Sequence, residues 1–387
     1  MNHQPPSDLP SSEVAAKLES PGMSYARARL YLGMSCVGMW VTLSGLALAF
    51  ALPQRLLSSS SSGAPSDVWQ LAAFVFLYAA AQATFDFFGG FVLPKEYGRY
   101  TPSLVGFLKH WFRATAIHGT ILGLVALALL YADRTAGFGL TLLVFLAISL
   151  LLLSGQLIIS RLIAGIVVKP HNGALLLLSP YSHLTGGFAG LGKGTKIVMP
   201  GRWQDDLPPK VFEAQLERRR LILEGGSRRS GLIGALAWNT LGFILAYLAT
   251  GGVSSVAAIV GFSLYNTLWA FLGVLVLPSL SRPAVFQADA AVVRHGADPR
   301  DFSEGLRVLD QHQDDEFSRT STVETVFHPI PSVANRIGKL SETTLGPGAW
   351  HLARIALYLS WANLSFLSRA VHCNLGRPEV WVFLPSD

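Results

Sequence analysis

Residues 139–160 have the sequence GLTLLVFLAISLLLLSGQLIIS, which contains no charged side chain. About 20 apolar residues form a helix long enough to cross the ~30 Å hydrocarbon core of a bilayer. Five further runs are similarly long and apolar: Leu30–Leu52, Trp69–Leu93, Ala114–Tyr131, Gly231–Ala249 and Ser255–Leu277. The sequence therefore predicts a mainly α, polytopic membrane protein with six transmembrane helices.

The overall composition agrees with this prediction. Of the 387 residues, 51% are hydrophobic and only 14% are charged, whereas soluble domains contain about 25% charged residues. Two cysteines are too few for a disulfide framework. The net charge of +6 is typical of membrane proteins with basic cytoplasmic loops, so we expect no nucleic-acid partner.

The basic residues alternate between successive loops. The loop after the second run contains Lys95, Arg99, Lys109 and Arg113. The loops after the first and third runs contain only Arg55 and Arg134, and the loop near Gly251 contains no basic residue. By the positive-inside rule, both termini and both large polar segments are predicted to lie in the cytoplasm.

The runs divide the chain into six predicted parts. These are a cytosolic tail (1–29), a four-span region (30–168), the first part of a cytosolic α+β domain (169–230), a two-span hairpin (231–280), the second part of that domain (281–345) and a C-terminal amphipathic helix and tail (346–387). Within the domain we expect strands near 173–179 and 194–200, and a helix near 209–225 with Asp205 and Asp206 as caps. Further helices are expected near 283–296 and 301–312.

The C-terminal part has apolar residues at most positions of Trp350–Val371. We interpret it as an amphipathic helix on the bilayer or against the spans. The alternative is a seventh span, which has sufficient length but would bury Arg354.

Three motifs occur in a characteristic order: GGFAGLGKGTKIVMPGRW (186–203), SRPAVFQADAAVVRHGADP (281–299) and FHPIPSVANRIGKL (327–340). In this order and spacing, the chain resembles the integral-membrane zinc metallopeptidases of the HtpX and CAAX prenyl protease type, peptidase family forty-eight. The resemblance implies a cytosolic metallopeptidase-like domain and a bacterial inner (plasma) membrane location. It also implies a glycine-rich strand before an HExxH helix, and a third zinc ligand, Glu, in the second motif.

The residues that such a zinc site needs are replaced. Alignment with the family places Arg218 and Ile222 at the two His positions, Arg219 at the Glu position and Val285 at the third ligand. Arginine and isoleucine offer no lone pair to a metal, and the sequence has no histidine between residues 184 and 294. Only Asp289, which supports a ligand in the family, remains. We therefore expect no zinc cofactor and a vestigial site in which Arg218 or Arg219 faces Asp289.

A second candidate site lies among the membrane spans. Asp86 is an ionisable residue within the second run, with Gln82 one turn before it and His118 in the third run. Charged groups at this depth are costly and often functional. The alternative is that Asp86 lies near the cytoplasmic end, where Lys95, Arg99 or water satisfies it.

Three functions follow from these features. The preferred one is a catalytically inactive metallopeptidase-like protein, a pseudoenzyme, that binds a membrane protein, a peptide or membrane lipid. The first alternative is an active membrane metalloendopeptidase with an unrecognised metal site. The second is a transporter that uses the embedded polar residues.

Overall fold

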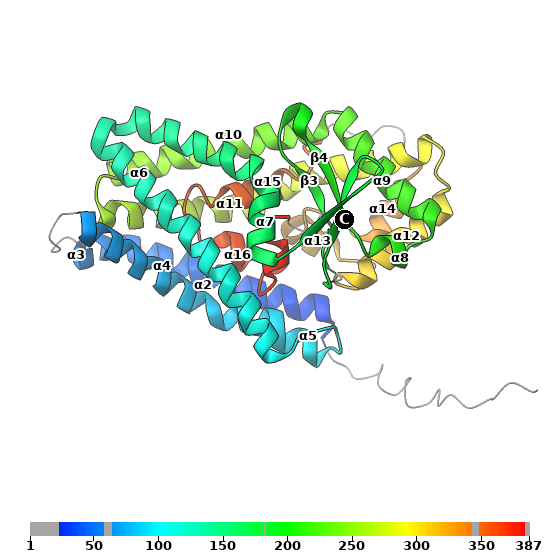
Figure 1. The fold of residues 1–387 in the computed structure, drawn as a ribbon, viewed down its shortest axis with the longest axis horizontal. Helices are drawn as coiled ribbons and strands as arrows, with labels where there is room; N and C mark the ends of the chain where they lie inside the picture. The colour runs from blue at the N-terminus through cyan, green and yellow to red at the C-terminus, as the bar shows by residue number, and fades with distance from the viewer. Residues whose placement is uncertain (1–22, 58–63, 182, 343–347, 384–387) are drawn as a thin grey trace, which may run out of the picture.

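The computed structural model describes residues 23–57, 64–181, 183–342 and 348–383. Long helices form an elongated bundle, and a small sheet with shorter helices lies at one end of it (Figure 1). Most of the predicted tail 1–29 lies outside the described residues. The first described helix, α2 (Tyr25–Ala49), begins five residues before the predicted run because the Ser24 hydroxyl caps it by accepting from the Arg27 N–H.

Among the described residues, five helices are long and apolar enough to cross a membrane. They are α2, α4 (Ala64–Phe87) with its continuation through η1 (Phe88–Val92) and α5 (Leu93–Glu96), α6 (Leu104–Ser154), α10 (Ser227–Thr250) and α11 (Val256–Arg294). A straight helix of 51 residues such as α6 would be about 75 Å long, well over the bilayer thickness. However, the backbone leaves helical geometry at Ala136 (φ −145°, ψ 17°) and Gly137 (φ 62°, ψ −151°). The predicted runs three and four therefore correspond to the two arms of α6, with the end of run four on the next helix, α7 (Gln156–Ala164). Each of the six predicted runs overlaps one of the five helices.

The outer surface of the bundle is strongly apolar. Many large side chains on the spans are exposed; Phe76, Leu77, Leu124, Leu151 and Leu248, for example, are between 61 and 70% exposed. An apolar surface of this kind on several neighbouring helices matches a lipid environment rather than water.

The sixth span continues into the polar domain without a break. A separate helix was expected near 283–296, but α11 extends to Arg294 through Pro278 and Pro283. Proline removes a backbone donor and normally kinks or ends a helix. Here the Ser279 and Ser281 hydroxyls donate to the carbonyls of Val276 and Leu277, at 2.6 and 3.0 Å. These hydroxyls do not replace the bonds that the two prolines remove, which are those to the carbonyls of Val274 and Ser279. The packing around α11 therefore maintains the helix.

The small sheet has four strands in the order β1-β2-β4-β3. They are β1 (Val167–His171), β2 (Ala174–Leu178), β3 (Gly187–Ala189) and β4 (Lys196–Pro200). β2 pairs antiparallel with β1 and parallel with β4, and β3 pairs antiparallel with β4. The strands expected near 173–179 and 194–200 are thus present as β2 and β4, whereas β1 was not expected.

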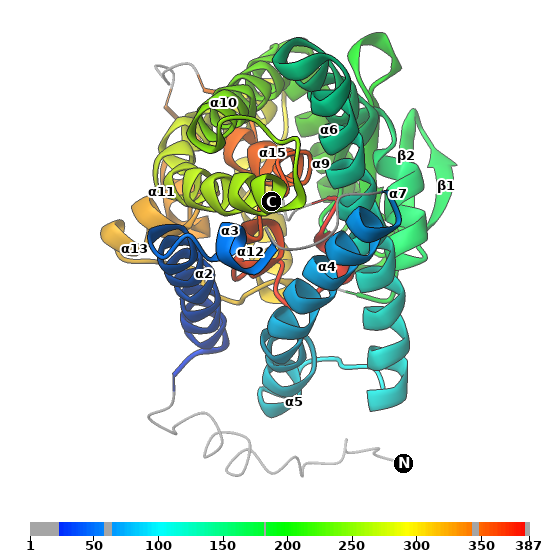
Figure 2. The same ribbon diagram turned by 90° about the vertical axis from the view of Figure 1, so that its left-hand side faces the viewer.

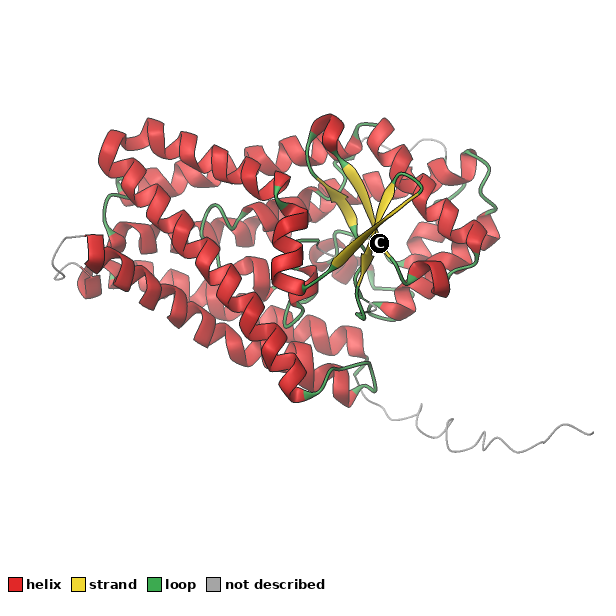
Figure 3. Cartoon of the chain, in the orientation of Figure 1, coloured by secondary structure: helices red, strands yellow, loops and turns green. Residues whose placement is uncertain are grey.

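Helices flank this sheet in the polar domain (Figure 3). The short helix η2 (Gly192–Gly194) joins β3 to β4, and α8 (Trp203–Asp206) and α9 (Pro209–Glu224) come between β4 and the last two spans in the sequence. After α11 come α12 (Pro299–His312), α13 (Ser321–Phe327) and α14 (Val333–Gly338). The expected helices near 209–225 and 301–312 are α9 and α12. Asp205 and Asp206 do not cap α9, because they belong to α8 and Pro208 is at the N-cap.

The prediction of one amphipathic helix at Trp350–Val371 is wrong. The structure has only α15 (Leu352–Leu359) and α16 (Leu367–Ala370) there, followed by η3 (Pro378–Val380). Serine and asparagine side chains compete with helical hydrogen bonds, and between α15 and α16 the Ser365 N–H donates to the Ser360 carbonyl at 3.1 Å. Residues 356–371 are all buried, so the segment is enclosed on every side and has no face at the bilayer surface.

We name residues 350–383 the C-terminal segment. It lies inside the bundle and is surrounded by α2, α4, α6, α10 and α11 (Figure 2). The remaining short helices of the membrane region are α3 (Leu52–Leu57) and α7 (Gln156–Ala164). The interior that the spans enclose is therefore filled by the chain itself.

The topology prediction can be tested with reporter fusions. Because loop charges alternate, fusions at Gly137 and Gly252 are expected to report the outside. Fusions at Lys95 and Lys210 are expected to report the cytoplasm. Cysteine accessibility at the same four positions in sealed cells provides an independent check, and the opposite assignment at Lys210 would invert the predicted orientation.

Candidate functional site

The metallopeptidase-like site is formed where α9 meets α11. Arg218 and Ile222 lie one turn apart on α9, and Val285 and Asp289 lie one turn apart on α11. All four side chains are at most 2% exposed. Residues four apart share a helix face. The face of α9 that carries Arg218 and Ile222 therefore meets the face of α11 that carries Val285 and Asp289 in the interior of the domain.

Asp289 is held between two guanidinium groups. Arg218 Nε donates to Asp289 Oδ1 at 2.6 Å. Arg336, from α14, donates through Nε to Oδ2 at 2.7 Å and through Nη2 to Oδ1 at 3.1 Å. The three side chains are at most 3% exposed. We name them the Arg–Asp–Arg cluster.

Arg219 and Ile222, at two other replaced positions, contact other parts of the domain and not Asp289. Arg219 does not face Asp289: its guanidinium donates to the carbonyls of Gln215 and Thr185, at 2.9 and 3.2 Å, and stacks on Trp203. Ile222 packs in the apolar core of the domain. Of the two arginines considered, Arg218 is therefore the one that contacts Asp289.

These residues do not fit a zinc ion. Arg218 presents a cation bonded to the one acid of the site, and Ile222 and Val285 present hydrocarbon, whereas zinc binds thiolate, imidazole or carboxylate. Within the described ranges, no group of three or more His, Cys, Asp or Glu side chains is arranged to hold a metal.

Elsewhere in the molecule a carboxylate lies between two histidines, but this group is a hydrogen-bonded network and not a metal site. Glu379 lies between His110 and His183, with His110 Nε2 at 3.2 Å from Glu379 Oε2. Arg113 Nη2 lies 3.2 Å from His110 Nδ1. A guanidinium can only donate, so Nδ1 is the acceptor and Nε2–H is left to donate to Glu379. The group is thus a hydrogen-bonded network, in which the imidazoles lower the pKa of Glu379 even though burial raises it.

Asp86 is completely buried, and its partners come mainly from the C-terminal segment. Arg369 Nη2 bonds Asp86 Oδ2, and both side chains are 0% exposed. The Gly376 N–H donates to Oδ1 at 3.0 Å, and Trp111 Nε1 donates to Oδ2 at 2.9 Å. The expectation that Lys95, Arg99 or water satisfies Asp86 is therefore wrong.

Gln82 belongs to the same network. Its Oε1 accepts from Trp40 Nε1 at 2.8 Å, and its Nε2 donates to Asp86 Oδ1 at 3.3 Å. His118 is also buried, with its ring 4.5 Å from that of Trp361 and 5.8 Å from that of Trp381. Among the described residues neither ring nitrogen of His118 has a hydrogen-bond partner. The structure thus places Asp86 and His118 against the C-terminal segment, and Gln82 beside Asp86.

The backbone of the C-terminal segment is irregular, so many of its carbonyls need hydrogen-bond donors from side chains. Unsatisfied polar groups are costly inside a membrane protein. Asn239 donates to the Ala356 carbonyl at 3.0 Å, and Ser263 Oγ donates to that of Leu364. Arg29 donates to the carbonyls of Leu375 and Gly89, at 3.1 and 2.6 Å, and so joins the segment to α4.

Glycine permits the closest approach between the segment and the spans. A Cβ on Gly90 would lie 2.1 Å from the Gly376 carbonyl oxygen, and Gly376 itself has φ +68°. Neither position accepts a side chain without a shift of the backbone. The contact between η1 and residues 374–377 therefore depends on this pair of glycines.

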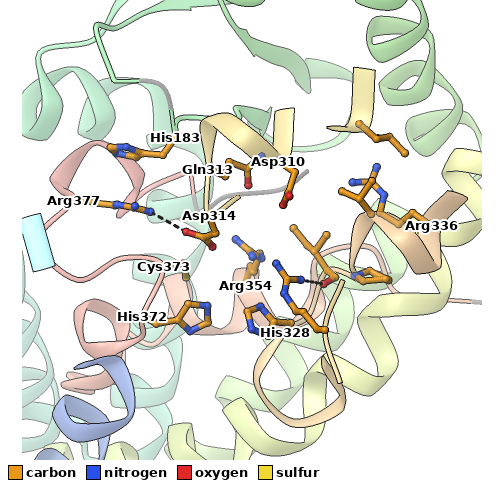
Figure 4. Close-up of a pocket in the computed structure, with 15 residues that line it drawn as sticks. His183, Asp310, Gln313, Asp314, His328, Arg336, Arg354, His372, Cys373 and Arg377 are labelled. Atoms are coloured by element: carbon orange, nitrogen blue, oxygen red, sulfur yellow. Dashed lines mark hydrogen bonds and ion pairs between the residues drawn. The ribbon is translucent and has the colours of Figure 1, made fainter. Parts of the chain in front are cut away.

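A small polar cavity lies between the polar domain and the C-terminal segment, with a volume of about 40 Å³ (Figure 4). Asp310 and Asp314 face it from α12 and the turn that follows, and His328 faces it from across the cavity. Burial raises the pKa of Asp310 to about 6. Burial also raises the pKa of Asp314, but Arg377 and Arg29 outweigh it and lower that pKa overall. Burial, with Arg319, holds the pKa of His328 well below its usual value.

The chain was compared with known proteins. Residues 2–169 match the family model described as CAAX prenyl protease N-terminal, five membrane helices. A search of curated proteins found no match. Among solved structures, the fold is similar to the crystal structure of S. mikatae Ste24p, with a TM-score of 0.58 and 14% sequence identity over 85% of this chain and 83% of that chain.

These findings confirm the resemblance predicted from the sequence. The chain is a polytopic membrane protein. Its N-terminal region is similar to the CAAX prenyl protease N-terminal family, and its fold is similar to that of Ste24p. The family model covers the four-span region, whereas the three motifs lie at 186–340, so the two lines of evidence come from different parts of the chain.

Proposed function

We propose that this protein is a catalytically inactive member of the family-forty-eight type and that it acts by binding a ligand at the membrane. On this proposal it lies in a bacterial plasma membrane with both termini in the cytoplasm. The observation that carries the proposal is the Arg–Asp–Arg cluster. Its guanidinium groups occupy the meeting point of α9 and α11, where the resemblance implies a divalent cation.

The charge at this point explains why a metal is disfavoured. Zn²⁺ beside Arg218 and Arg336 would meet two fixed positive charges in a buried, weakly screened environment. Asp289 already accepts three hydrogen bonds from these arginines. Binding zinc would require breaking them, and the site lacks an imidazole or thiolate to replace them.

The transporter alternative receives less support. It relies on Asp86, Gln82 and His118 lining an open polar path through the spans. In the structure Asp86 is bonded to Arg369 and Gly376, and aromatic rings of the C-terminal segment pack on His118. These contacts favour a structural role for the three polar residues, which is to hold the C-terminal segment in place.

Metal analysis tests the proposal. The purified protein is expected to hold far less than one zinc per chain, and chelators are expected to leave its melting temperature unchanged. It is also expected not to cleave casein or a prenylated CAAX peptide. Stoichiometric zinc that tracks stability, or cleavage that chelators abolish, would overturn the proposal in favour of an active metalloendopeptidase.

A rebuilt variant sharpens this experiment. The substitutions Arg218→His, Arg219→Glu and Ile222→His create HExxH on α9, and Val285→Glu adds the third ligand. Two histidines at i and i+4 lie on one helix face and can bind one ion. If the proposed alignment is correct, this variant gains zinc that the parent lacks. A control that moves the three α9 substitutions one residue along the helix, to Arg219, Arg220 and Leu223, is expected to gain none.

A further inference from the structure

A long apolar groove lies between α2 and α11, with a volume of about 360 Å³. Leu30, Met34 and Val37 line it from α2, and Phe271 and Leu275 line it from α11. Met34 and Leu275 are 40% and 38% exposed, so the groove borders the outer surface of two spans. Its volume is within the range of small-molecule sites.

The inner end of the groove meets the polar cavity. Arg354, His372 and Cys373 line both spaces. Phe327 and Pro329 line the groove, and His328 between them lines the cavity. Figure 4 shows Arg354 and His328 beside each other at the centre of the cavity, with His372 and Cys373 nearer to α2. An apolar channel thus leads from the lipid-facing surface to a polar end.

The polar end is rich in guanidinium groups. Arg319, Arg336, Arg354 and Arg377 line the cavity with two acids, Asp310 and Asp314, and the buried guanidinium of Arg29 bonds the His372 carbonyl. His328 is 7% exposed, and its Nε2 has no hydrogen-bond partner among the described residues. A buried polar atom without a partner is costly unless a ligand or water satisfies it.

We propose that the groove and cavity bind one anionic phospholipid of the surrounding bilayer. An acyl chain lies between α2 and α11, and the phosphate lies at the inner end near Arg354 and His328. Guanidinium groups and phosphates form strong charge-assisted hydrogen bonds. A bilayer lipid is the occupant because the groove borders the surface that the spans expose to lipid. This inference deepens the proposed binding function by naming the ligand class.

Glycines on α2 provide a matched pair of variants. A Cβ on Gly38 or on Gly45 meets no atom within 4 Å, so both positions accept a larger residue. Gly38 lines the groove and Gly45 does not. Gly38→Leu therefore fills the groove, and Gly45→Leu adds the same side chain to the same helix elsewhere.

The experiment measures binding of phosphatidylglycerol and phosphatidylcholine to the full chain by native mass spectrometry, with melting temperature as a second readout. We expect the wild type and Gly45→Leu to retain phosphatidylglycerol in preference to phosphatidylcholine. Gly38→Leu is expected to bind about tenfold more weakly or worse, since even one methylene changes affinity in an apolar pocket by 10-fold or more. Arg354→Gln is expected to abolish the preference for the anionic lipid, and Arg354→Lys to keep it.

Three outcomes would overturn the proposal: equal retention of both lipids, equal binding by the two glycine variants, or binding of a lipidated peptide but of neither phospholipid. The last would assign the groove to a different occupant. The result is independent of zinc content, so the failure of this inference is distinguishable from the failure of the proposed catalytic inactivity.

Discussion

Asp289→Asn is expected to lower the free energy of unfolding by about 3–5 kcal/mol, the cost of leaving a buried charge without its partner. The substitution preserves the size of the side chain but removes the negative charge between Arg218 and Arg336. Both guanidinium groups are at most 3% exposed, so water does not replace the lost carboxylate. Thermal or chemical denaturation of the detergent-solubilised protein measures the change.

Two further variants separate charge from packing. The triple variant Arg218→Met, Asp289→Leu, Arg336→Met removes all three charges and keeps similar volumes. It is expected to be much closer to wild type than Asp289→Asn, since replacing a buried ionic cluster by hydrocarbon is often neutral or stabilising. Glu304→Gln breaks an exposed pair with Arg307, 65% and 46% exposed, and should cost about 0–1 kcal/mol. A loss below ~1 kcal/mol for Asp289→Asn would contradict the buried cluster.

The membrane spans and helices α9 and α12 of the domain were predictable from the sequence because their signals are local. A run such as residues 139–160 is apolar at nearly every position, and bilayer thickness then determines its length. Strand β2 is likewise a short apolar run, ALLLL. By contrast, β1 (VVKPH) contains a lysine and a proline and is mostly exposed. It forms as an edge strand through pairing with β2, a contact that its own composition does not indicate.

The C-terminal segment was mispredicted because burial on all sides leaves no hydrophobic period. The side chains of residues 356–371 are all buried, regardless of their direction. The spacing of apolar residues therefore does not reveal which face of the segment packs against the protein. The backbone turns where Ser360, Asn363 and Ser365 cluster. The hydrogen-bond partners of this stretch lie on distant spans: Asn239 accepts from Asn363, and Ser263 donates to the Leu364 carbonyl. No local pattern connects these residues.

The contact between Arg218 and Asp289 was predictable because it follows from the order of family motifs. Arg336 lies in the third motif, but the sequence alone did not indicate that it joins the same carboxylate. Arg369 is separated from Asp86 by 283 residues. One signal was present: each is a charged residue in an apolar segment, and opposite charges at such depth need a partner.

The other large expected effect concerns this intramembrane pair. Asp86→Asn is expected to destabilise the protein by about 3–5 kcal/mol because it leaves the Arg369 charge buried without a carboxylate. Arg369 is 0% exposed and stacks on Trp381 at 4.0 Å, so it cannot move to water without displacing the C-terminal segment. Loosening of that segment should appear as faster hydrogen exchange or proteolysis within residues 350–383.

A double-mutant cycle decides whether the pair itself holds the segment. Arg369→Met alone leaves Asp86 buried and still bonded to Trp111 and the Gly376 N–H, and a comparable loss of stability is expected. Asp86→Asn with Arg369→Met removes both charges, so its loss should be smaller than the sum of the single losses by about 0.5–3 kcal/mol, the coupling found between contacting residues. Asp67→Asn breaks the pair with Arg134, which is 30% exposed at the far end of the spans, and provides the control for a carboxylate that water can replace. Strictly additive losses for Asp86 and Arg369 would show that each residue stabilises the bundle separately, and the C-terminal segment would then be held by its other contacts, such as the glycine contact and the hydrogen bonds from Arg29, Asn239 and Ser263.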